Sequence, residues 1–259
     1  MLFSPHAITL LAGPHFSFPQ GPVANEEIAL RWVHIVSGII WIGLLYFFNL
    51  VATPMMKALD APVRAKVFPA LMERAMWWFR WSAVVTALMG LRYFWIILAA
   101  DANNAGNPWL AWRWMGLWLL VWLVAFALIY PLQLPHTGIL DNAWVRTIAI
   151  AAIIIAASWA ALYVNASPDS SNAQLSICVG GGMGLLLLLN VWGVVWRAQK
   201  RLIAWTRESA EQGTPMPPEA ARLARWAFLA SRTGFWISLP MLFFMAAAEH
   251  YPFLSGIAN

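Results

Sequence analysis

Apolar residues are gathered into six long stretches, which are separated by polar segments and by proline or glycine. Each stretch has about the 20 apolar residues that an α-helix needs to cross the hydrocarbon core of a bilayer. The pattern therefore predicts an all-α fold, a polytopic membrane bundle of about six transmembrane helices. The predicted spans are Ile28–Ala52, Met76–Ala100, Trp109–Tyr130, Trp144–Asn165, Ala173–Trp196 and Leu223–Ala248.

The composition agrees with a membrane protein and excludes a soluble one. Only 10% of the 259 residues are charged, 61% are hydrophobic, and the mean hydropathy is +0.66. Soluble domains carry about 25% charged residues. The single cysteine, Cys178, lies in an apolar run, which excludes an internal disulfide, a cysteine-based zinc site and a CxxCH haem attachment.

Lysine and arginine are concentrated in alternate connections. Those after the first and the fifth span are rich in them, at Lys57, Arg64, Lys66, Arg74, Arg197, Lys200, Arg201, Arg207 and Arg222. The segments 101–108 and 166–174 and both terminal tails contain none. Cytoplasmic loops carry the excess of basic residues, so both termini are expected outside. In a bacterium this is a multi-pass protein of the inner (cytoplasmic) membrane. The net charge of +5 reflects this asymmetry and does not indicate nucleic acid.

The chain divides into three parts on this basis. Residues 1–27 have no cleavable signal peptide pattern and predict an outer surface segment rich in Pro, Gly and Phe. Residues 28–252 form the six-helix membrane domain, and residues 253–259 are a short outer tail. The polar, proline-containing segment 208–219 predicts a solvated loop.

One histidine, His34, lies inside a predicted span, where an ionisable side chain is a functional hypothesis by default. Gly38 and Trp41 fall near its face of the helix by the i+4 and i+7 spacing. A flat ring could rest against the backbone at Gly38. These are features of an axial haem ligand in an apolar pocket, so His34, Gly38 and Trp41 are candidate haem b residues. The alternative is a histidine that only hydrogen-bonds between helices, and both interpretations stay open.

Other basic residues extend the haem hypothesis. His250 closes the sixth span on the same side as His34 and could ligate the same iron from the opposite face, or simply lie at the interface. His136, in a loop on the inner side, is a weaker candidate metal ligand. Arg31 is one turn from His34 and could pair with a haem propionate or extend to the outer headgroups.

Glycines on the fifth span have a separate structural meaning. Gly180 and Gly184 match the small-xxx-small spacing of close helix contacts. Met241 and Met245 share a helix face and predict core packing.

Three stretches resemble the membrane domain of the membrane-bound urate oxidase (urate hydroxylase) family. They are Arg31–Gly43 (RWVHIVSGIIWIG), Trp78–Trp81 (WFRW), and Ser238–Met245 (SLPMLFFM) with His250–Pro252 (HYP) after it. The first of these is the least specific. His-x-x-x-Gly-x-x-Trp first spans also occur in membrane proteins of the copper-resistance D and protoporphyrinogen oxidase types.

The resemblance implies an oxidoreductase scaffold, but the sequence departs from the family pattern at two points. Family members typically continue into a C-terminal cytochrome c domain, and no CxxCH motif is present here. Thr233, Gly234 and Phe235 stand where the family tends to carry a His-Asn-Asn triplet. Both differences count against urate oxidation and favour a protein that keeps only the scaffold of the family.

Three functions follow as hypotheses. The first is a haem-b electron-transfer subunit near the periplasmic face, with a cytochrome c or other subunits of a complex as partners. The second is a haem-free accessory or structural subunit of a larger membrane complex. The third is a urate-oxidase-like oxidoreductase.

Overall fold

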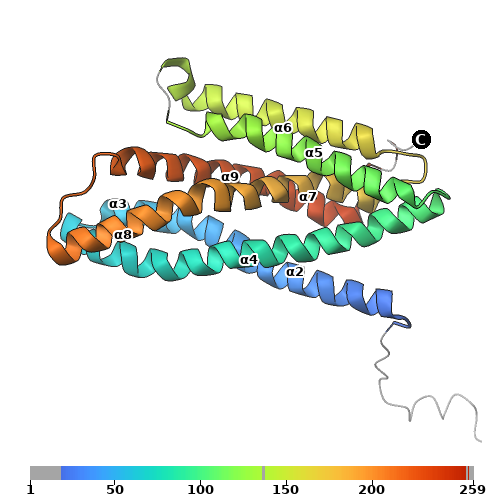
Figure 1. Cartoon of the computed structure of the whole chain (residues 1–259), viewed down its shortest axis with the longest axis horizontal. Helices are drawn as coiled ribbons and strands as arrows, with labels where there is room; N and C mark the ends of the chain where they lie inside the picture. The colour runs from blue at the N-terminus through green and yellow to red at the C-terminus, as the bar shows by residue number, and fades with distance from the viewer. Residues whose placement is uncertain (1–18, 136–137, 255, 257–259) are drawn as a thin grey trace, which may run out of the picture.

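The computed structural model describes residues 19–135, 138–254 and 256, and within these ranges every regular element is helical. Six helices in these ranges are long and apolar enough to cross a membrane, and they lie side by side as rods in Figure 1. In chain order the elements are α2 (Pro22–Tyr46), η1 (Phe47–Ala52), α3 (Thr53–Ala58), α4 (Ala61–Asn104), α5 (Trp109–Leu132), η2 (Gly138–Asp141), α6 (Ala143–Asn165), α7 (Asn172–Asn190), η3 (Val191–Val195), α8 (Trp196–Gln212) and α9 (Ala220–His250).

All six predicted spans are confirmed as helices that are long and apolar enough to cross a membrane. Large apolar side chains are exposed along them, as at Ile39, Leu120, Ile155 and Phe243. Only lipid can cover such a surface without cost, so the protein is a multi-pass membrane protein.

Two of the predicted connections are largely helical, which corrects the sequence-based boundaries. The first rod continues through α3 to Ala58 and α4 begins at Ala61, so only residues 59–60 separate them. In the predicted loop 208–219, α8 continues to Gln212, and Gly213 ends it in the left-handed conformation at φ 71°. Hydropathy marks where a helix leaves lipid, but a helix that packs on its neighbours can continue into water.

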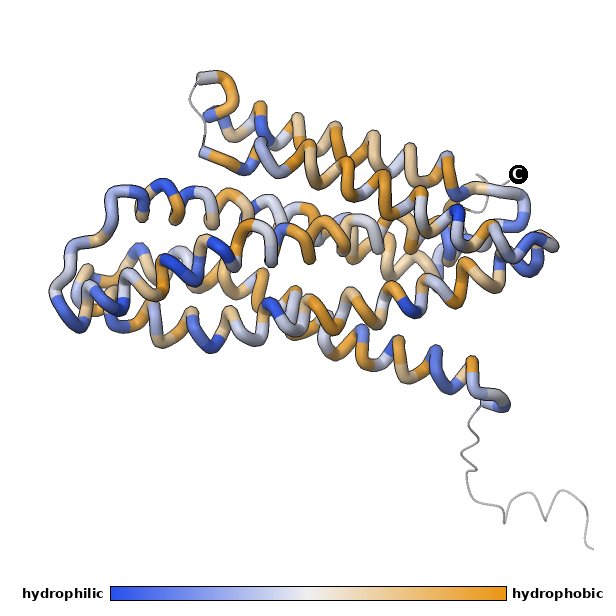
Figure 2. The backbone as a smooth tube through the Cα atoms, viewed as in Figure 1, coloured by the Kyte–Doolittle hydropathy of each residue, from blue (hydrophilic) through white to orange (hydrophobic). Residues whose placement is uncertain are grey.

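These extensions gather at one end of the bundle. We call it the basic end, because the α3–α4 and α8–α9 connections with their Lys and Arg residues lie there. Figure 2 shows hydrophilic segments concentrated at this end and at the opposite one, with apolar segments between. The opposite end, where α2 begins and α9 ends, is called the terminal end.

Glycines let α7 occupy the centre of the bundle, where 67% of its most apolar window is buried. The Trp122 ring of α5 lies directly on Gly182, and its Nε1 donates to the carbonyl oxygen of Cys178 at 3.2 Å. On another face, a Cβ at Gly180 would lie 2.9 Å from Phe244 Cβ of α9. The close helix contact predicted from Gly180 and Gly184 is therefore confirmed at Gly180, whereas a Cβ at Gly184 would make only an ordinary contact with Met241 Sδ at 3.7 Å.

Two π-helical segments interrupt the long rods, and each follows or contains a buried asparagine. Asn49 lies within η1 and donates to Ser231 Oγ at 2.9 Å, while Asn190 precedes η3 and donates to the Ala230 carbonyl oxygen at 2.8 Å. Both bonds end on adjacent residues of α9, Ala230 and Ser231, so a polar layer joins η1, α7 and α9.

A buried carboxylate stabilises the terminal end. Asp101 of α4, only 6% exposed, accepts hydrogen bonds from the backbone nitrogen and the hydroxyl of Ser171, at 2.9 and 2.6 Å. Ser171 is the N-cap of α7, and its hydroxyl oxygen accepts from the Gln174 backbone nitrogen at 3.1 Å. The contact fixes the start of the central helix to the end of α4.

Candidate functional site

A cavity of about 480 Å³ lies between α2, α4, α7 and α9, towards the terminal end. Pockets of about 300–1,000 Å³ are the usual size for small-molecule and cofactor sites. Ile39 of α2 and Leu242 of α9, which are 68% and 41% exposed, are both among the lining residues. The cavity is therefore open towards lipid between these two helices.

His34 lines this cavity, and its ring orientation is fixed by a backbone contact with α4. Its Nδ1 lies 2.8 Å from the carbonyl oxygen of Thr86. A carbonyl oxygen only accepts, so Nδ1 must carry the hydrogen and donate. In the neutral ring this leaves Nε2 with a free lone pair, and among the described residues Nε2 has no hydrogen-bond partner.

The backbone of α4 makes room for the imidazole at a glycine. A Cβ at Gly90 would lie 2.8 Å from His34 Cε1 and 2.9 Å from Nδ1, closer than real side chains approach. Gly38, the residue singled out from the sequence, also lines the cavity, but a Cβ there would meet only Thr86 Cγ2 at 3.6 Å. The histidine ring itself therefore rests on Gly90 of the neighbouring helix.

Hydroxyl groups complete the α2–α4 contact beneath the ring. Thr86 Oγ1 lies 2.9 Å from Ser37 Oγ, and Ser37 Oγ donates to the Val33 carbonyl oxygen at 2.6 Å. Ser37 thus bonds within its own helix, which is one of the two roles its position allows. Both hydroxyl side chains are buried, so the polar contact is shielded from exchange with water.

Charged groups gather where the cavity meets the terminal end. Arg31 lies 3.8 Å from a carboxylate oxygen of Glu249, its guanidinium is 5.7 Å from the centre of the Tyr93 ring, and Tyr93 donates to Glu249 at 3.1 Å. Arg31, Tyr93 and Glu249 all line the cavity. Its outer margin is therefore polar while its walls are apolar.

Trp41 lines the deeper part of the cavity and is 2% exposed. Its indole Nε1 is buried and has no hydrogen-bond partner among the described residues. A buried N–H without an acceptor costs about 1–3 kcal/mol, so an acceptor on a bound group would relieve it. Gly180, Gly181 and Gly184 of α7 form a smooth part of the same wall.

The residues present fit a flat, largely apolar metal macrocycle such as haem b. One imidazole with a free nitrogen faces the space, glycines leave the wall smooth, and Arg31, which lies 3.8 Å from the Glu249 carboxylate, provides a cation at the polar margin. No group of three or more His, Cys, Asp or Glu side chains that could hold a bare metal ion occurs in the described part of the chain.

The second predicted ligand, His250, is not brought to this cavity. It ends α9, is exposed, and its ring is 6.4 Å from that of Tyr251. The lining residues of α9 include Met241 and Met245 instead. The ligation of one haem iron by both His34 and His250 stays a prediction. His136, together with His6 and His15 of the terminal segment, lies outside the described residues.

Two residues that position the His34 ring were not identified from the sequence. To the ring itself Thr86 contributes a backbone oxygen, and Gly90 contributes the absence of a side chain, so neither carries a recognisable motif. Arg92 of α4 does not line the cavity, and its guanidinium forms two hydrogen bonds to the Glu26 carboxylate at 2.6 and 2.9 Å.

Comparison with known proteins gives one match. A family model described as urate oxidase N-terminal matches residues 59–259. The match includes the WFRW and SLPMLFFM stretches, whereas the Arg31–Gly43 stretch precedes it. No curated protein and no solved structure matches the chain.

Proposed function

Since a family model matches residues 59–259, the chain belongs to the urate oxidase N-terminal family, and we propose that it is a membrane electron-transfer subunit that binds haem b in the His34 cavity. The observation that carries the proposal is the hydrogen bond from His34 Nδ1 to the Thr86 carbonyl oxygen. Metal-bound histidines almost always donate their other ring nitrogen to such an acceptor, which fixes the tautomer and orients the ring.

Several residues of the chain would together hold the haem. His34 would offer Nε2 to the iron, Gly90 lets the imidazole lie against α4, and Arg31 would pair with a propionate at the polar margin. Met241 and Met245 of α9 also line the cavity, and we place their sulfur atoms ahead of His250 as residues that would hold the iron together with His34. Haem b, when bound, accepts and releases single electrons.

Location and partners follow from the charge asymmetry. We place the protein in a bacterial inner membrane with the basic end in the cytoplasm, which puts the His34 cavity towards the periplasmic side. Electrons would pass between a reductant in the membrane and a periplasmic cytochrome c or another subunit of a complex.

The experiment is a reduced-minus-oxidised spectrum and a pyridine haemochrome assay on the full chain purified in mild detergent. We expect a b-type α-band in the wild type and its loss in His34→Gln. His250→Ala is the comparison, and it should keep both the haem and the spectrum. A wild-type protein with no b-type band would overturn the proposal and leave the haem-free accessory function.

Family membership itself supports a second function, the oxidation of urate or a similar molecule. The test is turnover of urate by the haem-loaded protein with a series of electron acceptors. The region that carries Thr233, Gly234 and Phe235 gives no polar triplet: Phe235 packs edge-on against Tyr46 at 5.2 Å, and a Cβ at Gly234 would lie 3.2 Å from Leu187. We therefore rank this function second.

A further inference from the structure

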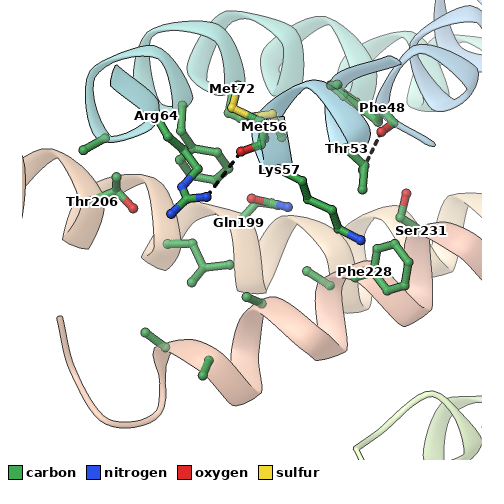
Figure 3. Close-up of a pocket in the computed structure, with 18 of the residues that line it drawn as sticks. Phe48, Thr53, Met56, Lys57, Arg64, Met72, Gln199, Thr206, Phe228 and Ser231 are labelled. Atoms are coloured by element: carbon green, nitrogen blue, oxygen red, sulfur yellow. Dashed lines mark hydrogen bonds between the residues drawn. The ribbon is translucent and has the colours of Figure 1, made fainter. Parts of the chain in front are cut away.

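A second cavity, of about 640 Å³, lies at the basic end between α3, α4, α8 and α9. Figure 3 shows side chains from all these segments facing a common space. Its walls are largely apolar, with alanines along α9 at Ala220, Ala221, Ala224 and Ala227. These small side chains are what keeps the space open on that side.

The cavity is apolar at one end and cationic at the other. Phe48, Met76 and Val195, all buried, lie at or close to the ends of the predicted spans. Lys57 and Arg64 line the other part, where both side chains are exposed. An occupant must therefore combine an apolar body with an anionic group.

Neither cation is neutralised by the protein. In the described ranges Lys57 and Arg64 form no ion pair, and Arg64 donates only to the Met56 carbonyl oxygen, at 3.4 Å. Other basic residues at this end do have partners: Arg225 pairs with Asp141 at 2.7 Å, and Arg207 pairs with Glu73. Figure 3 shows the Lys57 side chain extending over the space between α8 and α9.

A buried acceptor adds a further requirement. Gln199 Oε1 is buried in the cavity wall and has no donor among the described residues. An occupant that carries a hydroxyl or amine donor near its anionic group would satisfy this oxygen.

The level of the site in the membrane identifies the source. Lys57 is five residues beyond Ala52, the end of the first predicted span, which corresponds to about 7.5 Å along a helix. The headgroup region on each side of the hydrocarbon core is about 5–8 Å thick. Lys57 thus stands at the level of the lipid phosphates on the basic side.

We infer that this cavity binds an anionic phospholipid of the adjacent leaflet, with its phosphate between Lys57 and Arg64, a headgroup donor on Gln199 and an acyl chain against the apolar end. Basic pockets between membrane helices on the cytoplasmic side are known to bind anionic headgroups. Phosphatidylglycerol has both the charge and the hydroxyl donors that the site requires. The inference concerns a different site from the His34 cavity and does not depend on haem.

The test is native mass spectrometry of the full chain released from nanodiscs of equal phosphatidylglycerol and phosphatidylcholine. We expect retained phosphatidylglycerol in the wild type. Each cation near the surface is worth about fivefold in affinity, so Lys57→Gln with Arg64→Gln should reduce retention about 25-fold. Lys200→Gln with Arg201→Gln is the matched control, because it removes the same charge from α8 outside the cavity.

A second variant tests the space in the cavity independently of its positive charge. Ala224→Trp fills the space without altering any cation, and it should displace the lipid while leaving the melting temperature in lipid-free detergent unchanged. Equal losses in the two double variants, or no preference for phosphatidylglycerol over phosphatidylcholine, would overturn the inference. Displacement of the lipid by glycerol phosphate alone would also overturn it, because a soluble anion would then be the occupant.

Discussion

The contact between Gly182 and Trp122 makes a strong quantitative prediction about stability. A Cβ at Gly182 would lie 1.8 Å from Trp122 Cε2 and 1.9 Å from Nε1, whereas carbon atoms in contact are about 3.5–4.0 Å apart. In Gly182→Ala the ring or the helix must therefore move by about 1.7 Å or more. Trp122 is 0% exposed, and its Nε1 bonds to the Cys178 carbonyl oxygen, so the ring has no free space to enter.

The free-energy cost follows from three contributions. Overpacking of a full core costs about 1–3 kcal/mol, and loss of the indole hydrogen bond adds about 1 kcal/mol. Replacing glycine by alanine inside a helix returns about 1 kcal/mol. We expect Gly182→Ala to lower the free energy of unfolding by about 1–3 kcal/mol.

The assay is thermal unfolding in mild detergent, followed by circular dichroism. Gly184→Ala is the control on the same helix, because its Cβ would meet only Met241 Sδ at an ordinary 3.7 Å. Its melting temperature should stay the same or rise. Trp122→Leu combined with Gly182→Ala should recover part of the loss. If Gly182→Ala proves as stable as Gly184→Ala, the packing argument for α7 is wrong.

Three further predictions concern the site and its supports. Gly90→Ala should push the His34 ring from its place and weaken haem binding at least tenfold in a haem titration, whereas Gly38→Ala should leave the affinity close to wild type. Asp101→Ala leaves the part-buried donors of Ser171 without their acceptor, so it should lower stability in chemical unfolding by about 1–3 kcal/mol, and Asp101→Asn should lower it less. Removing haem from the loaded protein should lower its melting temperature, and a melting point independent of haem would count against specific binding.

The sequence predicts the membrane-crossing part of the fold well, because the bilayer imposes one simple requirement. Any stretch such as Trp109–Tyr130 must be apolar and helical to cross it, and the observed α5 ends only two residues later, at Leu132. Outside the bilayer that requirement ends. The sequence pattern therefore did not indicate that the α3–α4 connection is only two residues long, between Ala58 and Ala61.

The candidate site was predictable in its centre but not in its surroundings. His34 is conspicuous because an ionisable side chain within a membrane span is energetically costly and is usually kept for a function. Its contacts come from α4, more than 50 residues further along the chain, through a backbone oxygen and a glycine. A backbone oxygen is present at every residue, and a glycine is defined by a missing side chain, so neither contact can be recognised from the residue types along the sequence. Periodicity within α2 could identify Gly38 but not Gly90.

The π-helical segment η1 has a consequence for how sequences of this kind should be aligned. Successive residues of a helix differ by about 100° around the axis, and a π turn holds one more residue than an α turn. Deleting one residue between Phe47 and Ala52 would therefore turn Lys57 about 100° away from its present direction while the span stayed equally apolar. A single gap at this point would look harmless in a hydropathy profile, yet it would change which side chains α3 presents to α8 and α9.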